Sequence, residues 1–245
     1  MVLLRSILFF VYFALLTVVT FIGCLPTLLM PRKAVIWASR NWSRLVFWGL
    51  KHLAGLDYEV RGEVPKSGVL IAAKHMNMWD TMALYLVLYD PAAVAKRELL
   101  NIPFYGWYLR KAGVIAIDRG GHASALRKMA AQARTAFASG RSVLIYPEGT
   151  RKPPGAPPDY KSGVAGLYGQ LGVPCVPVAL NCGLFWTGPM GLIKKPGRIV
   201  VEFLEPIPPG LKRQEFMATL QGRIETATAR LVVEGRQLLA REGVL

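Results

Sequence analysis

A histidine and an aspartate lie five positions apart, where the chain changes from a strand pattern to a helix pattern. The apolar run Val69–Ala73 is typical of a buried strand, so His75 follows the carboxyl end of a strand, where open α/β sheets place their ligand clefts. Asn77 and Asp80 have the spacing of a capping box, which would turn the carboxylate back toward the imidazole. A histidine oriented by an acid can act as a general base. The alternative is that Asp80 only favours the helix start and His75 is an ordinary polar residue.

Basic residues occur at the ends of three further predicted strands. Lys96 closes one strand, Arg119 follows the next, and Arg151 lies shortly after a third, with Lys161 a weaker candidate further on. Because the carboxyl ends of parallel strands meet at one edge of a sheet, these cations could converge on a phosphomonoester. Taken singly, each could equally be a solvated surface charge.

Other reactive side chains fit this chemistry less well. His52 falls on a predicted surface helix, and His122 follows a Gly-Gly turn, so neither competes strongly with His75. The scattered cysteines Cys24, Cys175 and Cys182 form no metal-ligand pattern. No nucleophile elbow is present, which favours direct transfer over a covalent enzyme intermediate. We expect neither a metal nor an organic cofactor.

The elements that must position these residues alternate along the chain after residue 56. This alternation predicts an α/β fold with a largely parallel sheet flanked by helices. The predicted strands are Tyr58–Arg61, Val69–Ala73, Ala92–Ala95, Val114–Ile117, Val143–Tyr146, Cys175–Leu180 and Ile199–Leu204. The predicted helices are Thr81–Tyr89, Tyr105–Lys111, Ala123–Ala138, Gly163–Leu171 and Arg213–Ala240.

Charge and hydropathy together indicate an anionic lipid surface as the partner. The formal net charge is +15, which favours nucleic acid, membranes or phosphorylated substrates. However, 53% of the residues are hydrophobic and the mean hydropathy is +0.33, and no known nucleic-acid-binding motif is visible. We therefore expect membrane lipids and no nucleic acid as partners.

The amino-terminal segment supports membrane association. No charged residue occurs between Arg5 and Arg32, and the apolar stretch Ile7–Leu25 would be about 28 Å long as a helix, close to the thickness of a bilayer core. The next stretch, Ala34–Ala54, alternates tryptophans with basic residues, as in a helix lying among lipid headgroups. Residues 1–55 are therefore predicted to be a membrane anchor and residues 56–245 the α/β domain. Whether the anchor spans the bilayer or enters one leaflet stays open, and a cleaved or lipidated signal near Cys24 is a weaker alternative.

Four blocks of sequence resemble the glycerolipid acyltransferase family, and most closely its bacterial 1-acylglycerol-3-phosphate O-acyltransferases. The resemblance covers about residues 56–210. Two departures are small: the chain has Met76-Asn77 where the family often has Gln-Ser, and Tyr146 where it often has Phe. The four blocks are His75–Asp80, Gly113–Arg119, Tyr146–Arg151 and Val173–Val178.

The resemblance implies a membrane-bound enzyme of phospholipid biosynthesis. More basic charge follows the apolar segment, at Arg32 and Lys33, than precedes it, at Arg5, which predicts that the domain lies on the cytoplasmic face of the bacterial inner membrane. It implies that acyl-CoA or acyl-carrier protein donates an acyl chain to lysophosphatidic acid, giving phosphatidic acid, with His75 and Asp80 catalytic. A lyso-ornithine-lipid O-acyltransferase or a non-catalytic membrane-surface protein remains an alternative. The acceptor phosphate would be held by Lys96, Arg119 and Arg151, and the rest of the acceptor by Glu148, Gly149 and Thr150.

Overall fold

A seven-stranded mixed sheet forms the centre of the molecule, in a computed structural model that describes residues 1–118, 122–187 and 191–243. The strand order is β1-β7-β6-β2-β5-β3-β4, and the last five strands of that order are parallel to one another. β1 and β7 are parallel to each other but run opposite to the rest. The strands are β1 Leu56–Arg61, β2 Leu70–Ala73, β3 Ala92–Lys96, β4 Ile115–Ile117, β5 Val143–Ile145, β6 Cys175–Leu180 and β7 Gly197–Phe203.

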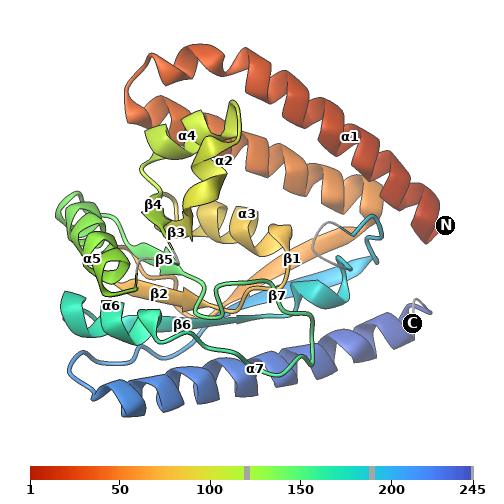
Figure 1. Ribbon diagram of the computed structural model, residues 1–245. Coiled ribbons are helices and arrows are strands. Elements are labelled where there is room, and N and C mark those ends of the chain that lie inside the picture. The colour runs from red at the N-terminus through yellow and green to blue at the C-terminus, as the bar shows by residue number, and fades with distance from the viewer. Residues whose placement is uncertain (119–121, 188–190, 244–245) are drawn as a thin grey trace.

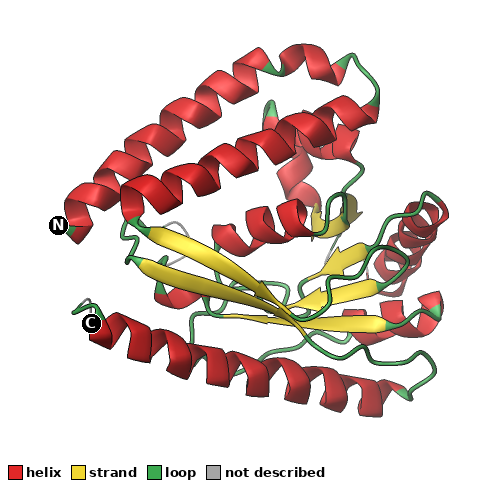
Figure 2. Ribbon diagram, turned by 180° about the vertical axis from the view of Figure 1, so that it is seen from behind, coloured by secondary structure: helices red, strands yellow, loops and turns green. Residues whose placement is uncertain are grey.

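Helices cover both faces of this sheet (Figures 1 and 2). The hairpin of α1 and α2 packs with α3 over one face, while α5, α6 and α7 cover the other. The α-helices are α1 Val2–Gly23, α2 Arg32–Gly49, α3 Met78–Val87, α4 Tyr105–Ala112, α5 His122–Ala138, α6 Gly163–Leu171 and α7 Arg213–Arg241. Short turns are η1 Leu25–Leu28, the π-helical η2 Leu50–Ala54, η3 Arg97–Asn101 and η5 Cys182–Leu184.

The predicted fold class is confirmed, and each predicted strand and helix is present with its ends shifted by a few residues. The apolar run of β2 shows why the pattern was reliable. Ile71 and Ala73 pack into the core under the hairpin, and Leu70 and Ala72 pack into the core on the opposite face. Successive side chains of a strand alternate between faces, so a strand buried on both faces must be apolar throughout.

The amino-terminal hairpin is part of the main core. Phe9, Val46 and Leu50 are almost completely buried in the same cluster as the central strands, and the Phe47 ring meets Trp79 of α3 edge-on at 5.5 Å. The chain changes from hairpin to sheet near residue 55, and the division into two domains there stays a prediction. Because the two parts share a core, deleting the hairpin would expose apolar surface on the sheet.

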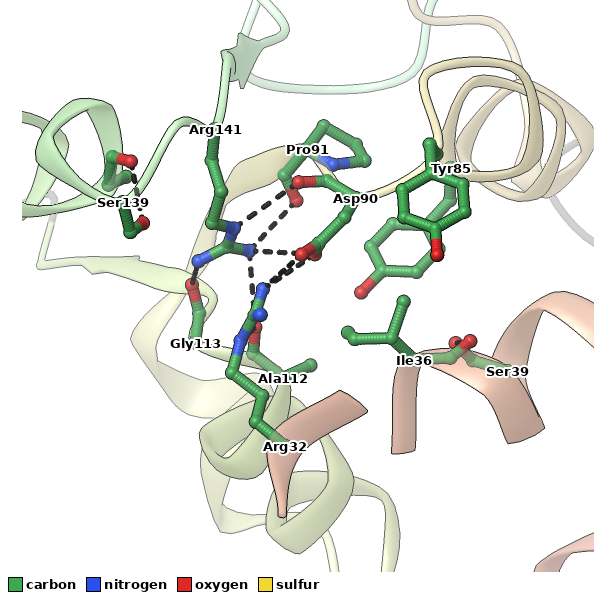
Figure 3. Close-up of polar contacts among 12 residues, drawn as sticks. Arg32, Ile36, Ser39, Tyr85, Asp90, Pro91, Ala112, Gly113, Ser139 and Arg141 are labelled. Carbon is green, nitrogen blue, oxygen red and sulfur yellow. Dashed lines mark hydrogen bonds and ion pairs between the residues drawn. The ribbon is translucent and has the colours of Figure 1, made fainter. Parts of the chain in front are cut away.

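A partly buried charged cluster fastens the hairpin to the sheet (Figure 3). Arg32 at the start of α2 forms an ion pair with Asp90 at 2.6 Å, and Arg141 approaches the same carboxylate at 3.4 Å. Arg32 also donates to the carbonyl of Ala112, the last residue of α4. Asp90 lies just before β3 and Arg141 just before β5, while Arg32 comes from the hairpin and also bonds α4. The cluster thus joins these four elements at the amino edge of the sheet.

The polar face expected for Ala34–Ala54 is only partly turned toward solvent. Arg40 donates to the carbonyls of Leu86 at 2.7 Å and Tyr89 at 2.9 Å, at the end of α3. Cations are favourable beside the unsatisfied carbonyls of a helix end, which explains this inward orientation. Lys51 forms an ion pair with Asp57. Arg40 and Lys51 therefore both have partners within the protein, and neither depends on a lipid headgroup for one.

Candidate active site

His75 and Asp80 form the predicted pair at the carboxyl edge of the sheet. The imidazole Nδ1 lies 2.8 Å from Asp80 Oδ1, and the Asp80 side chain is fully buried. The second carboxylate oxygen accepts the backbone N–H groups of Met76 at 2.7 Å and Asn77 at 3.0 Å. Because Nδ1 faces the carboxylate, it carries the ring proton and leaves Nε2 to accept a proton from substrate.

The start of α3 builds this geometry locally. The Asn77 side chain accepts the N–H of Trp79 while Asp80 accepts the N–H of Asn77, which is the capping box predicted from the spacing. The Asn77 amide also donates to the carbonyl of Trp186 at 2.8 Å, in the segment after β6. Two strand ends are therefore joined beneath the imidazole, and its orientation does not depend on a flexible loop.

The surroundings of the imidazole favour His75 as the base and disfavour a covalent nucleophile. The ring stacks on Tyr146 with centroids 4.1 Å apart, and 14% of the His75 side chain remains accessible. Cys182 approaches the same carboxylate, but burial and then the charge of Asp80 raise the pKa of its thiol well above the usual range. A buried, protonated thiol is a poor nucleophile.

Two of the three predicted phosphate-binding residues, Lys96 and Arg151, follow strands that end at the same edge of the sheet as β2 and His75. Lys96 is the last residue of β3 and is exposed. The backbone N–H of Lys152 donates to the carbonyl of His75 at 2.8 Å, which brings the segment that carries Arg151 against the end of β2. The charge of Arg151 lowers the pKa values of the Tyr105 and Tyr146 hydroxyls, opposing the larger effect of burial. Arg119 lies outside the described residues.

Glu148 occupies a different position from the two residues that follow it. Its carboxylate is buried and lies 2.9 Å from the ammonium of Lys74, the residue before His75. Burial raises the pKa of Glu148, and the hydrogen bond from Lys74 opposes this rise. Thr150 is exposed, and Gly149 has a φ of +65°, a conformation that favours glycine at this turn. The turn therefore presents Thr150 to solvent and the Glu148 carboxylate to the interior.

Lys74 connects this turn to the far side of the molecule. Its ammonium also lies 2.8 Å from Glu225 on α7, and the Tyr160 hydroxyl donates to that same carboxylate oxygen at 2.9 Å. Sequence reasoning missed this network. The only signal in the sequence was that Lys74 directly follows an apolar strand. A lysine buried there would need an acidic partner.

We expect Glu225→Ala to raise the KM for the acceptor several-fold, with the KM for the donor unchanged. The substitution leaves Lys74 with one acid and the Tyr160 hydroxyl without its acceptor, which loosens both ends of the segment carrying Arg151. The lost hydrogen bonds would lower the free energy of unfolding by roughly 1–3 kcal/mol. Steady-state kinetics with each substrate varied in turn, together with thermal unfolding, measure both effects.

Glu234→Ala is the matched control on the same helix. It removes ion pairs with Arg61 at 2.8 Å and Arg230 at 2.9 Å, remote from His75. This variant should change stability without changing either KM. Glu225→Gln should be intermediate, because an amide oxygen can still accept both hydrogen bonds. A KM change of equal size in both alanine variants would show that the network acts only on overall stability.

Three weaker candidates have other surroundings. The Lys161 ammonium forms an ion pair with Asp159 at 2.7 Å on the surface of the loop. The exposed His52 ring contacts the Trp48 ring of the hairpin in a tilted arrangement, with centroids 4.8 Å apart. His122 is the first residue of α5. Among the side chains that the structure describes, His75 is therefore the histidine that an acid orients at the edge of the sheet.

Comparison with known proteins agrees with this geometry. The Acyltransferase family model matches residues 57–181, just over half of the chain. A 1-acyl-sn-glycerol-3-phosphate acyltransferase of Pseudomonas aeruginosa is 39% identical over 164 residues, covering 66% of this chain and 63% of that protein. A lyso-ornithine lipid O-acyltransferase of the same organism is 30% identical over 206 residues, covering 75% and 78%. The chain thus spans slightly less than two thirds of the first of these relatives.

A solved structure shows the same fold. The LPA acyltransferase PlsC from Thermotoga maritima matches with a TM-score of 0.76 and 22% identity, over 94% of this chain and 98% of that chain. At this identity the match concerns the fold alone. Together, the family match over the catalytic blocks and the buried His75–Asp80 pair lead to one conclusion: this chain belongs to the acyltransferase family.

Proposed function

We propose that this protein transfers an acyl chain from an acyl thioester to the free hydroxyl of 1-acylglycerol 3-phosphate, forming phosphatidic acid. The observation that carries the proposal is the oriented His75–Asp80 pair with Arg151 at the same sheet edge. The similarity to the Pseudomonas enzyme supports the choice of acceptor. The proposed donors are acyl-CoA or acyl-carrier protein, and the reaction needs no further cofactor.

The mechanism is direct acyl transfer. His75 Nε2 takes the proton of the acceptor hydroxyl as the oxygen attacks the thioester carbonyl, forming a C–O bond and a tetrahedral intermediate. Collapse of the intermediate breaks the C–S bond, and the departing thiolate takes the proton from the imidazolium. Asp80 stabilises the imidazolium between these steps without itself being protonated. Lys96 and Arg151 supply charge for the acceptor phosphate, and Gly149 and Thr150 form the turn beside it.

A lyso-ornithine lipid is the second candidate acceptor, because the relative with that name matches over a larger part of both chains. The two acceptors differ in the phosphate that Arg151 would bind. The deciding experiment incubates the full-length protein with labelled acyl-CoA or acyl-carrier protein and a panel of lysophosphatidic acid, lysophosphatidylglycerol and lyso-ornithine lipid. Selective use of lysophosphatidic acid supports the proposal. Equal or better use of lyso-ornithine lipid would replace it.

We further propose that the hairpin lies in one leaflet of the membrane. α1 is long and apolar enough to cross a bilayer, but both of its ends contact the rest of the protein. The N–H of Lys194 donates to Ser6 Oγ at 2.9 Å, and the Tyr108 hydroxyl donates to the carbonyl of Phe21 at 2.9 Å. A helix held along the domain in this way can insert its outer face without crossing. We propose the cytoplasmic face, where the thioester donors occur.

The outer face of α1 provides a test. Its apolar side chains repeat at helical spacing and are half or more exposed: Leu4, Leu8, Val11, Leu15, Val18 and Ile22. Replacing Val11 and Val18 by Asp should abolish flotation with lipid vesicles without unfolding the protein. Val233→Asp on α7, an exposed valine on the opposite side of the sheet (Figure 1), should have no such effect. Undiminished flotation of the α1 variant would rule out this membrane face.

A further inference from the structure

An open hollow of about 580 Å³ lies between the turn of the hairpin and α4, and the proposed reaction does not use it. Leu28 of the turn and Trp107, Arg110 and Lys111 of α4 line it. Figure 1 shows α4 beside the end of the hairpin where α1 and α2 meet. None of these residues contributes to the site around His75. We call this feature the α4 hollow.

Exposed apolar side chains border the α4 hollow. Leu29 is 93% exposed, Met30 50%, Phe104 51% and Trp107 48%. Phe104 has a φ of +60°, which is uncommon for a residue with a side chain, and its ring lies 5.0 Å from that of Trp107. Phe104 is the N-cap of α4, and its carbonyl accepts the N–H groups of Trp107 at 3.0 Å and Tyr108 at 3.2 Å. The start of the helix therefore holds the half-exposed Phe104 ring beside Trp107 at the rim of the hollow.

The charged residues that line the α4 hollow are basic, and the nearby acid at the carboxyl end of α4, Asp90, is paired with Arg32 and Arg141. Within the described residues, neither Arg110 nor Lys111 forms an ion pair, and Lys33 at the start of α2 is exposed nearby along the turn. The sequence contains no acidic residue before Asp57, and none from residue 99 to residue 117. Exposed aromatic residues combined with unpaired basic ones are typical of protein surfaces that contact anionic lipid headgroups.

We propose that the α4 hollow binds the phosphate-bearing headgroup of an anionic phospholipid, with Trp107 and Phe104 at the level of the interface. The α4 hollow lies beside the carboxyl-terminal end of α1, because Tyr105 and Tyr108 of α4 both contact Phe21, the residue before Ile22 of the outer face. This inference rests on the proposed membrane association. The outer face of α1 would be the first contact with the membrane, and the α4 hollow would be a second contact that selects for anionic lipid.

The consequence is that a bound headgroup would fix the tilt of the catalytic domain on the bilayer. Arg32 holds the carboxyl end of α4, and Tyr105 at its start is close enough to Arg151 for that charge to affect its hydroxyl. The residues that would bind the headgroup and Tyr105, which neighbours the proposed acceptor site, are therefore on the same short helix. Lipid bound there would keep the cleft facing the surface from which lysolipid enters.

The test measures binding of the full-length protein to vesicles of phosphatidylcholine alone and of phosphatidylcholine mixed with phosphatidylglycerol. The double variant Arg110→Ala/Lys111→Ala should lose about tenfold or more in affinity for the anionic vesicles, because each basic residue near such a surface contributes on the order of 1 kcal/mol. Its affinity for neutral vesicles should stay near that of the wild type, since the hairpin is intact. Trp107→Ala should weaken binding to both kinds of vesicle.

Arg127→Ala/Lys128→Ala is the matched control, because it removes an adjacent, exposed basic pair from α5 and the same net charge. It should bind anionic vesicles as the wild type does. An equal loss in both double variants would show a general electrostatic effect and overturn the α4 hollow as a site, as would wild-type binding by the α4 variant. Displacement by inorganic phosphate as effective as by phosphatidylglycerol would overturn the lipid assignment. Binding is measured without turnover, so failure of the proposed acyl transfer would not affect the result.

Discussion

Replacing His75 with alanine is expected to lower kcat for acyl transfer by roughly 10²–10⁴-fold, the usual contribution of a general base. The reason is specific to this site: Nδ1 is held by Asp80 at 2.8 Å, so Nε2 is the group left to remove the hydroxyl proton. The measurement is turnover of labelled acyl thioester at saturating concentrations of both substrates. Vesicle binding should be unchanged, because His75 is remote from the outer face of α1.

Asp80→Asn separates the orienting role from the basic one. The carboxylate accepts hydrogen bonds from the His75 ring and from the N–H groups of Met76 and Asn77, and an amide can accept only some of them. We expect a smaller loss of kcat than for His75→Ala, because the base is still present. Thermal unfolding of both variants checks that the capping box survives. Full turnover by a folded His75→Ala protein would disprove the mechanism.

The parts of the site that could be predicted from the sequence are local or follow from strand direction. His75, Asn77 and Asp80 lie within one strand end and one helical turn, so spacing alone defines their geometry. Arg151 comes from the loop after β5, which is distant from β2 in the sequence. Parallel neighbours share a carboxyl edge, however, and β5 pairs directly with β2. The position of Arg151 could therefore be inferred without knowing a single side-chain contact.

The parts that could not be predicted depend on contacts between distant segments. Nothing near Glu225 indicates that it binds Lys74, which is 151 positions away in the sequence. Glu148 belongs to the recognisable block Tyr146–Arg151, yet its buried orientation follows from its ion pair with Lys74, which the block does not reveal. Helix α1 shows that hydropathy alone could not predict which face of an apolar helix is buried. Its two faces are both apolar, so the sequence could not reveal that the face bearing Phe9 packs into the core.

Replacing Arg151 with alanine is expected to raise the KM for lysophosphatidic acid by about tenfold or more, with the KM for the acyl donor near that of the wild type. A charge-assisted hydrogen bond to phosphate contributes on the order of 1.5–3 kcal/mol, which sets this magnitude. Arg151→Lys should restore only part of the affinity, because an ammonium cannot reproduce a two-pronged contact. Lys96→Ala should act in the same direction, since Lys96 ends the neighbouring strand β3.

Lys161→Ala is the control for loss of a cation from the same segment. Its ammonium pairs with Asp159 at the surface, so its removal should leave both KM values unchanged. The alanine variant of Arg151 should also lose the preference for lysophosphatidic acid over lysolipids whose phosphate is esterified or absent. This follows because a guanidinium at the proposed phosphate site would distinguish a phosphomonoester from a zwitterionic headgroup by charge. A defect that falls on the donor, or an unchanged preference among lysolipids, would remove Arg151 from the phosphate site and favour the lyso-ornithine lipid as acceptor.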